Sequence, residues 1–343
     1  NGRTEYRIPE VGSAGHHCTH QYVRFNLRPT DLVNGYNSLQ FRCAQEDTFW
    51  GHFIVDNTAL VIGIGASDER LVKAGLSDFE AVPRVECVAN DEQVIVRLDV
   101  PEMYHELIAA VHYHGYYLGY DEHGNERALD WHGMTKGRRP YGHLGSCTQQ
   151  PYELEWDTRM LPAQERVRIR AFVEFRDLPN LLFQTQPSNE FSISRDSAET
   201  VSVFRAVELP REFWSRAGKE KSCVIPIDVH PQDVVAAQLN VVTWTGGAGD
   251  VKDYFTLNGK AYPVAEGHSH EVVFSQLAVD KTELRDGDND IRLVSDTEHH
   301  GIEVLKPGPT LIVRHRLPPK VRLTESVRDR SAGGLDCYRI ETP

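Results

Sequence analysis

The chain has 343 residues and a mass of 38.9 kDa, which is long enough for two or three domains with cores of their own. Its formal net charge of −13 argues against nucleic acid as a partner, because phosphate binding needs a basic face. The longest apolar run, 59–64, is strand-sized and far below the roughly 20 residues of a membrane span.

The first predicted elements, in residues 1–65, follow a sequence plan that returns at 258–315. The matching pieces are 1–3 with 258–260, 31–41 with 283–293, and 49–64 with 299–314. In 31–41 and 283–293 the pairs Gly35/Gly287 and Asn37/Asn289 precede apolar residues at alternate positions, which is the pattern of a half-buried strand. An internal repeat of this kind predicts two copies of one structural unit.

The repeated pattern, L-x-x-G-x-N-x-I-x-(L/F) followed by (T/A)-L-(I/V)-(V/I), resembles galactose-binding-like jelly-roll domains. These sandwiches are common in carbohydrate-binding modules of multidomain secreted proteins. The resemblance covers residues 1–65 and about 203–316 and implies a jelly roll for each. It implies much less about a ligand, because a fold does not fix a function.

The two copies differ in what precedes them. Strand candidates at 221–229 and 238–247 come before the second copy, and no such strands precede the first. The first jelly roll is therefore expected to be incomplete at its N-terminus. Its apolar positions, such as Leu39 and Phe41, then need strands from a further N-terminal portion or from a neighbouring subunit, which would make a homo-oligomer.

The middle segment, 67–202, predicts a different all-β unit. Its strand candidates are 82–89, 92–100, 106–120, 151–158, 166–175 and 180–186. They are rich in β-branched and aromatic residues and are separated by Gly, Asn and Pro. The spacing favours an immunoglobulin-like or fibronectin-like sandwich with one long loop at 120–150.

That loop carries the strongest candidate binding site. The predicted ligand-binding residues are Tyr120, Asp121, Asp130, Trp131, His132 and Arg138. An aromatic ring packs on the C–H face of a sugar, while the acids accept hydrogen bonds from its hydroxyl groups. The preceding His112 and His114 share one strand face and could hold a metal instead. A packed loop whose rings fill the space between sheets stays open as the alternative.

Two further clusters are weaker. Asp286, Asp288 and Asp290 alternate along a turn and suggest structural calcium, although ordinary Asp-Gly and Asn-Gly turn chemistry explains them as well. The cluster formed by His16, His17 and His20 has no matching set in the second copy. The stretch 295–315 is predicted to be structural, a hairpin closing the sandwich with its turn at Pro307.

The sequence thus predicts an all-β chain in four parts. These are a partial jelly roll at 1–66, an immunoglobulin-like sandwich at 67–202, a second jelly roll at 203–317, and a linker with a new element at 318–343. The leading function is a non-catalytic carbohydrate-binding or structural region of a secreted carbohydrate-active protein, with a polysaccharide as partner. The alternatives are a polysaccharide lyase or glycoside hydrolase with its site near 112–143, a metal-dependent oxidative or amide-cleaving enzyme, and a fibre protein assembled by strand exchange.

Overall fold

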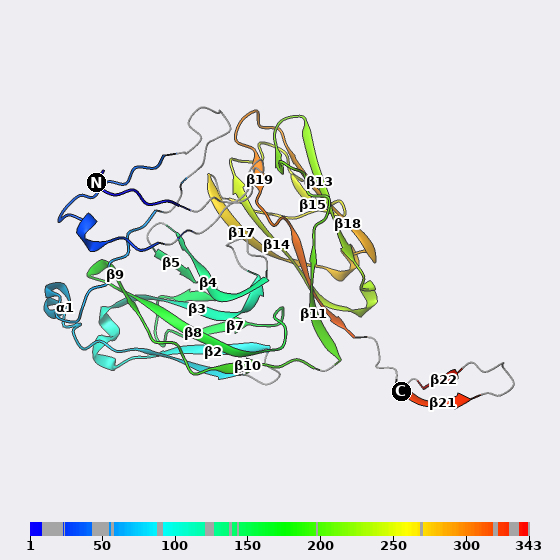
Figure 1. The fold of residues 1–343 in the computed structure, drawn as a ribbon, viewed down its shortest axis with the longest axis horizontal. Coiled ribbons are helices and arrows are strands. Elements are labelled where there is room, and N and C mark those ends of the chain that lie inside the picture. Colours follow the sequence, from blue (N-terminus) through cyan, green and yellow to red (C-terminus); the bar gives the residue numbers. More distant parts are fainter. Residues whose placement is uncertain are drawn as a thin grey trace.

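The computed structural model describes residues 1–8, 23, 25–42, 55, 58–87, 92–120, 127–136, 139–142, 144–196, 198–267, 270–317, 322–328 and 336–341. The protein is all-β, as predicted: antiparallel strands form its sheets, and the α-helix α1 (Glu69–Lys73) has five residues. No helix among the described residues is long and apolar enough to cross a membrane. Figure 1 shows the strands gathered into two sandwiches.

The first sandwich packs a three-stranded sheet against a seven-stranded one. The small sheet has the order β1-β2-β7, with β1 (Val82–Cys87), β2 (Gln93–Asp99) and β7 (Leu154–Asp157). The large sheet has the order β10-β8-β3-β4-β5, with β6 on β3 and β9 on β8. Its strands are β3 (Ile108–Tyr120), β4 (Arg127–Lys136), β5 (Arg139–Gly142), β6 (Gly145–Cys147), β8 (Gln164–Phe175), β9 (Leu178–Gln184) and β10 (Phe191–Ile193).

The core of this sandwich follows from the alternation that predicted the strands. In β8, Val167, Ile169, Ala171 and Val173 are fully buried, and the residues between them point to the opposite face of the sheet. The strand β2 alternates in the same way and contributes Val94 and other buried residues to the same core.

The predicted loop at 120–150 is wrong in most of its length, because β4, β5 and β6 lie within it. The strand β4 pairs with β3 from Tyr120↔Arg127 to Gly115↔His132. The 13-residue β3 offers backbone partners to β4, and these bonds satisfy the backbone of a stretch whose composition looks irregular. Of the residues predicted there, Asp121 and Arg138 lie outside the described part of the chain.

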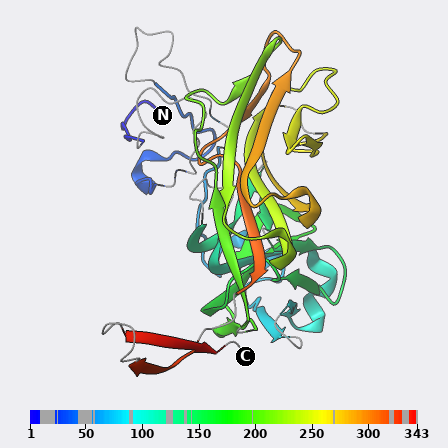
Figure 2. The ribbon, with the colours of Figure 1, turned by 90° about the vertical axis from the view of Figure 1, so that its right-hand side faces the viewer.

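The second sandwich is built from residues 199–316. One sheet has the order β11-β20-β14-β19-β12, with β17 on β14, and the other has the order β13-β18-β15-β16. The first sheet contains β11 (Glu199–Arg205), β12 (Trp214–Ser215), β14 (Val234–Thr245), β17 (Glu271–Val279), β19 (Ile302–Val304) and β20 (Thr310–Arg316). The second contains β13 (Lys219–Ile227), β15 (Phe255–Leu257), β16 (Lys260–Ala261) and β18 (Gly287–Ser295). Figure 2 shows these long strands standing above the first sandwich.

The stretch 295–315 contributes core residues as predicted, but not as a hairpin. Ile302, Val304, Leu311 and Val313 are buried in the core of the second sandwich. The strands β19 and β20 pair one after the other with the edge of β14 opposite β17, so residues 305–309 form a bulge between two collinear strands. Turn residues such as Pro307 and Gly308 show where a strand is interrupted. Because β19 and β20 both pair with β14, this interruption is a bulge and not a hairpin turn.

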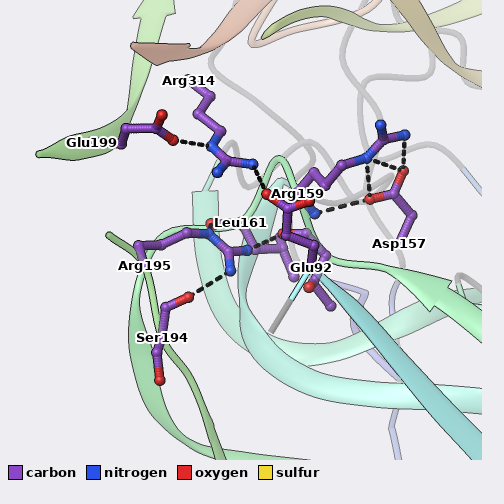
Figure 3. Close-up of polar contacts among 9 residues, drawn as sticks. Glu92, Asp157, Arg159, Leu161, Ser194, Arg195, Glu199 and Arg314 are labelled. Atoms are coloured by element: carbon purple, nitrogen blue, oxygen red, sulfur yellow. Dashed lines mark hydrogen bonds and ion pairs between the residues drawn. The ribbon is translucent and has the colours of Figure 1, made fainter. Parts of the chain in front are cut away.

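The two sandwiches meet at a junction of rings and charges. The ring of Tyr120, from β3, stacks on Phe274 of β17 with ring centroids 5.5 Å apart. Arg314 of β20 is 11% exposed and contacts Glu199 at 2.7 Å and Glu92, beside β2, at 2.8 Å (Figure 3). Arg195, in the segment that connects the two sandwiches, donates a hydrogen bond to the carbonyl oxygen of Leu161 in the first sandwich at 2.9 Å. These contacts fix one sandwich against the other.

The remaining described segments lie at the two ends of the chain. Among the described residues of 1–68 there is one short 3₁₀ turn, Pro29–Asp31, and no strand, so the strand pairing expected for 31–41 is not formed. The C-terminal hairpin of β21 (Arg322–Arg328) and β22 (Asp336–Glu341) lies apart from both sandwiches in both views (Figures 1 and 2).

Candidate functional site

The candidate site is the face of the large sheet that points away from the core of the first sandwich. We call it the outer face. Its residues come from three neighbouring strands, β3, β4 and β8: His112, His114, Tyr116, Trp131, Arg168, Arg170, Phe172 and Glu174. They share a face because their neighbours in each strand, such as Tyr113 and Ile169, fill the core.

Register places rings and guanidinium groups in alternation across this face. Tyr116 lies opposite both Trp131 and Arg168, and His114 lies opposite Arg170. The guanidinium carbon of Arg170 is 4.2 Å from the centroid of Trp131, and that of Arg168 is 4.6 Å from the centroid of Tyr116. Cation–π pairs of this kind contribute about 0.5–2 kcal/mol each, depending on solvent exposure.

Exposure falls from one end of the outer face to the other. Tyr116, Trp131, Arg168 and Arg170 are half-buried, whereas His112 and His114 are only 8% and 5% exposed. The half-buried end thus combines two aromatic rings with two guanidinium groups, whose Nε atoms are buried. Guanidinium groups hydrogen-bond carboxylate and sulfate oxygens in a fork, and aromatic side chains pack on apolar surface.

The buried end of the outer face holds a serine, a histidine and a carboxylate in contact. His112 Nδ1 is 2.7 Å from the hydroxyl oxygen of Ser146 in β6, and His112 Nε2 is 3.4 Å from Oε1 of Glu174. Ser146 itself is exposed. In the tautomer that carries its proton on Nε2, the imidazole accepts the Ser146 hydroxyl proton at Nδ1. Burial raises the pKa of the neighbouring Cys147 thiol, so that group stays protonated at neutral pH.

The residues predicted from the sequence are placed differently from one another. Trp131 lies on the outer face, whereas Asp130 is exposed and accepts a hydrogen bond from the backbone N–H of Trp131 at 2.7 Å. His132 is fully buried, and its ring stacks on Tyr117 at 4.1 Å. Tyr120 is 3% exposed and belongs to the junction with the second sandwich. Successive residues of β4 point to opposite faces of the sheet, so Trp131 lies on the outer face and its neighbours Asp130 and His132 do not.

The predicted calcium ligands are not brought together. Within the described part of the chain, which includes Asp286, Asp288 and Asp290, no three His, Cys, Asp or Glu side chains are placed to hold a metal ion. The carboxylate of Asp290 pairs with Arg285 at 3.0 Å, and Asp288 points to solvent. The turn is organised by the buried Asn289 between them, which hydrogen-bonds the backbone. His16, His17 and His20 lie outside the described residues.

Sequence reasoning missed the contribution of β8. Arg168, Arg170, Phe172 and Glu174 lie about 40 to 60 residues from Trp131 and His112 and reach them only through the pairing of β3 with β8. The signal was present in the stretch RVRIRAFVEF, where charged and aromatic residues alternate with a buried aliphatic series.

No protein family model matches the chain, and no curated protein matches it either. It is similar to a solved β-porphyranase of glycoside hydrolase family 86 from the human gut bacterium Bacteroides plebeius. The TM-score is 0.29 at 12% identity, over 69% of this chain and 37% of that one. BuGH86 in complex with neoagarooctaose has a TM-score of 0.30 at 11% identity, over 68% and 33%. An α-L-rhamnosidase from Aspergillus terreus has a TM-score of 0.19 at 11% identity, over 76% and 28%. The chain spans about a third of the length of these structures.

Proposed function

We propose that this chain is a carbohydrate-binding region of a secreted carbohydrate-active protein, and that the outer face binds the glycan. The observation that supports this is the half-buried row formed by Tyr116, Trp131, Arg168 and Arg170. Rings offer apolar surface to a sugar, and the two guanidinium groups bring positive charge to the same face. Two arginines in the row favour a polysaccharide that carries carboxylate or sulfate groups.

The protein supplies a matched control for this proposal. Trp214, in the second sandwich, is also half-buried and also lies beneath an arginine, with the Arg216 guanidinium carbon 4.3 Å from its ring centroid. Replacing Trp214 by Ala therefore removes an equivalent ring–arginine pair away from the outer face.

The test is affinity electrophoresis of the full chain in gels that contain an acidic or a neutral polysaccharide. Trp131→Ala should weaken retention by an acidic polymer about tenfold, because loss of one well-placed aromatic anchor removes on the order of 1.4 kcal/mol or more. Trp214→Ala should leave retention unchanged. Equal effects of the two substitutions, or no retention of the parent chain, would contradict the proposal.

A second candidate is a hydrolase that uses the buried end of the outer face. It is supported by the contact series Ser146–His112–Glu174, which has the order of a nucleophile, a base and an orienting carboxylate. The candidate predicts covalent labelling of Ser146 by a fluorophosphonate probe. Labelling should disappear in Ser146→Ala and fall strongly in His112→Gln, and peptide mapping would show which serine reacts. Labelling that survives in His112→Gln would argue against this chemistry.

A further inference from the structure

Two turns far apart in the chain are held by the same hydrogen bonds. Asn37 Nδ2 donates to the carbonyl oxygens four and two residues earlier, at 2.9 and 3.1 Å, and Asn289 Nδ2 does so at 2.9 and 3.0 Å. Each Oδ1 accepts the backbone N–H four residues earlier, at 2.9 Å in both turns. In each turn the residue two positions before the asparagine is a glycine with positive φ, +101° at Gly35 and +97° at Gly287.

A second asparagine joins each turn to a preceding segment. Asn1 Nδ2 donates to Asn37 Oδ1 at 2.8 Å, and Asn258 Nδ2 donates to Asn289 Oδ1 at 2.8 Å. The side-chain oxygen of each accepts the backbone N–H that follows the turn asparagine, at 2.9 Å in both cases. The short 3₁₀ turns Pro29–Asp31 and Lys281–Glu283 precede the two turns at the same distance along the chain.

The tyrosine contacts repeat as well. The hydroxyl of Tyr6 donates to the Asp31 carboxylate, and that of Tyr262 donates to the Glu283 carboxylate, each from one segment to the acid that ends the 3₁₀ turn. The described residues of 1–42 and of 258–295 therefore share one local structure down to individual side-chain contacts.

The apolar residues after the two turns differ completely in burial. In the second copy they are core residues, and in the first they are open to solvent. The exposed fractions are 56% for Leu39 against 0% for Ile291, 40% for Phe41 against 0% for Leu293, 43% for Leu60 against 0% for Leu311, and 61% for Ile62 against 0% for Val313. Exposed aliphatic series with unpaired backbone mark an interaction surface.

The second sandwich shows what covers the equivalent residues there. The strands β13 and β15 pair with the two edges of β18, and β14 and β11 pair with the two edges of β20. All four covering strands come from residues 199–257. No strand among the described residues plays this part for 35–42 or 58–64.

We propose that the described residues of 1–42, together with 58–64, belong to the closing half of a further β-sandwich and bind a set of strands with the pattern of residues 199–257. The partner is thus an antiparallel β segment with aliphatic residues at alternate positions, two of whose strands flank residues 35–42. A second copy of this chain fits less well, because its own residues 199–257 are already paired with β18 and β20 and packed in a closed core. This inference is independent of the glycan proposed for the outer face.

The experiment supplies such strands in a known register. A second copy of residues 199–257 is fused ahead of Asn1 of the full chain, so that Leu257 of the added copy precedes Asn1 as Leu257 precedes Asn258. Amide hydrogen exchange, read by mass spectrometry, should slow by at least about 100-fold at 35–42 and 58–64 relative to the parent chain, since closing a sheet protects its amides. Exchange at 287–295 is the internal reference and should not change.

A control variant carries Leu39→Asp and Phe41→Asp. Both positions are exposed in the parent, so the parent should tolerate the changes, while the fused chain should lose its gain in protection. A dye that binds exposed apolar surface gives a reading without the fusion: its fluorescence with the parent chain should fall in Leu39→Ser with Ile62→Ser.

Three results would overturn the proposal. The first is exchange at 35–42 that is already as slow in the parent as at 287–295. The second is a fused chain with no gain in protection, or dye fluorescence unchanged by the two serine substitutions. The third is protection that rises with protein concentration together with a dimer mass, which would make a second copy of this chain the partner instead.

Discussion

Leu311 and Leu60 allow the same substitution to be compared at a closed and an open copy of one sequence repeat. Leu311 is fully buried in the core of the second sandwich, and Leu60 is 43% exposed. Leu→Ala removes three carbon atoms, or about 2.4 kcal/mol of transfer free energy at roughly 0.8 kcal/mol per carbon. At Leu311 a cavity penalty adds to this term, so the free energy of unfolding of the second sandwich should fall by about 2–5 kcal/mol.

The expected effect at Leu60 is much smaller. Since 43% of that residue is exposed, about 57% of the transfer term remains, which is at most about 1.4 kcal/mol, and an open surface leaves no closed cavity. Leu60 also contributes nothing to the core around β18, so unfolding of the second sandwich should be unaffected by Leu60→Ala.

The assay is native-state hydrogen exchange at increasing urea, followed at the amides of 287–295 in the full chain. Leu311→Ala should lower the opening free energy of these amides, and Leu60→Ala should leave it within about 0.5 kcal/mol of the parent. An equal loss for both substitutions would mean that Leu60 belongs to a closed core, and the reasoning from exposure would be wrong.

Three further expectations follow from the described contacts. Burial raises the pKa of the Cys223 thiol to about 12 from an ordinary 9.0, so alkylation of the native protein at pH 8 should be about 1000-fold slower than in urea. For the same reason, the free energy of unfolding should fall as the pH rises from about 9 towards 12. Fast labelling of the native protein in a mass-spectrometric time course would contradict this. Arg314→Ala leaves the carboxylates of Glu92 and Glu199 without their guanidinium partner. Because Glu92 is 41% exposed, the free energy that holds the two sandwiches together should fall by only about 1–3 kcal/mol. Calorimetry should then show two separated melting transitions instead of one. Calcium or a chelator should leave the melting temperature unchanged, since the aspartates of the 286–290 turn are not assembled; a rise with calcium would restore the predicted site.

The fold class and most core positions could be predicted because successive side chains of a strand point to opposite faces of the sheet, so a buried face appears in the sequence as apolar residues at every second position. Val167, Ile169, Ala171 and Val173 in β8 alternate with Arg168, Arg170 and Phe172, and this pattern predicts that the aliphatic series lies in the core. The strands of 127–147 could not be predicted in the same way. Their partner is the long β3, and a pairing across the sheet compensates for a segment that is polar and rich in glycine.

The candidate site was predicted only in part for a related reason. His112, His114 and Trp131 lie within 20 residues of one another, and period-2 alternation correctly places the two histidines on one face. Arg168 and Arg170 join them through the register of β3 with β8, which nothing in the local sequence specifies. The same alternation removes His132 from the face, because its neighbour Trp131 occupies it.

The two turns around Asn37 and Asn289 show that a short segment specifies its own hydrogen bonds but not the burial of the strand that follows it. Their hydrogen bonds are local: an asparagine amide, a glycine with positive φ and a backbone N–H four residues away suffice to build them. These bonds form alike in an open and a closed copy, so they do not depend on the sheet. Burial of the following strand does depend on it, because its covering strands lie far away along the chain, and in the second copy they come from β13 and β15. A turn of this kind therefore sets the register in which covering strands can pair with the segment that follows it. Such strands would bury the exposed Leu39 and Phe41, and the burial of this apolar surface would stabilise the pairing.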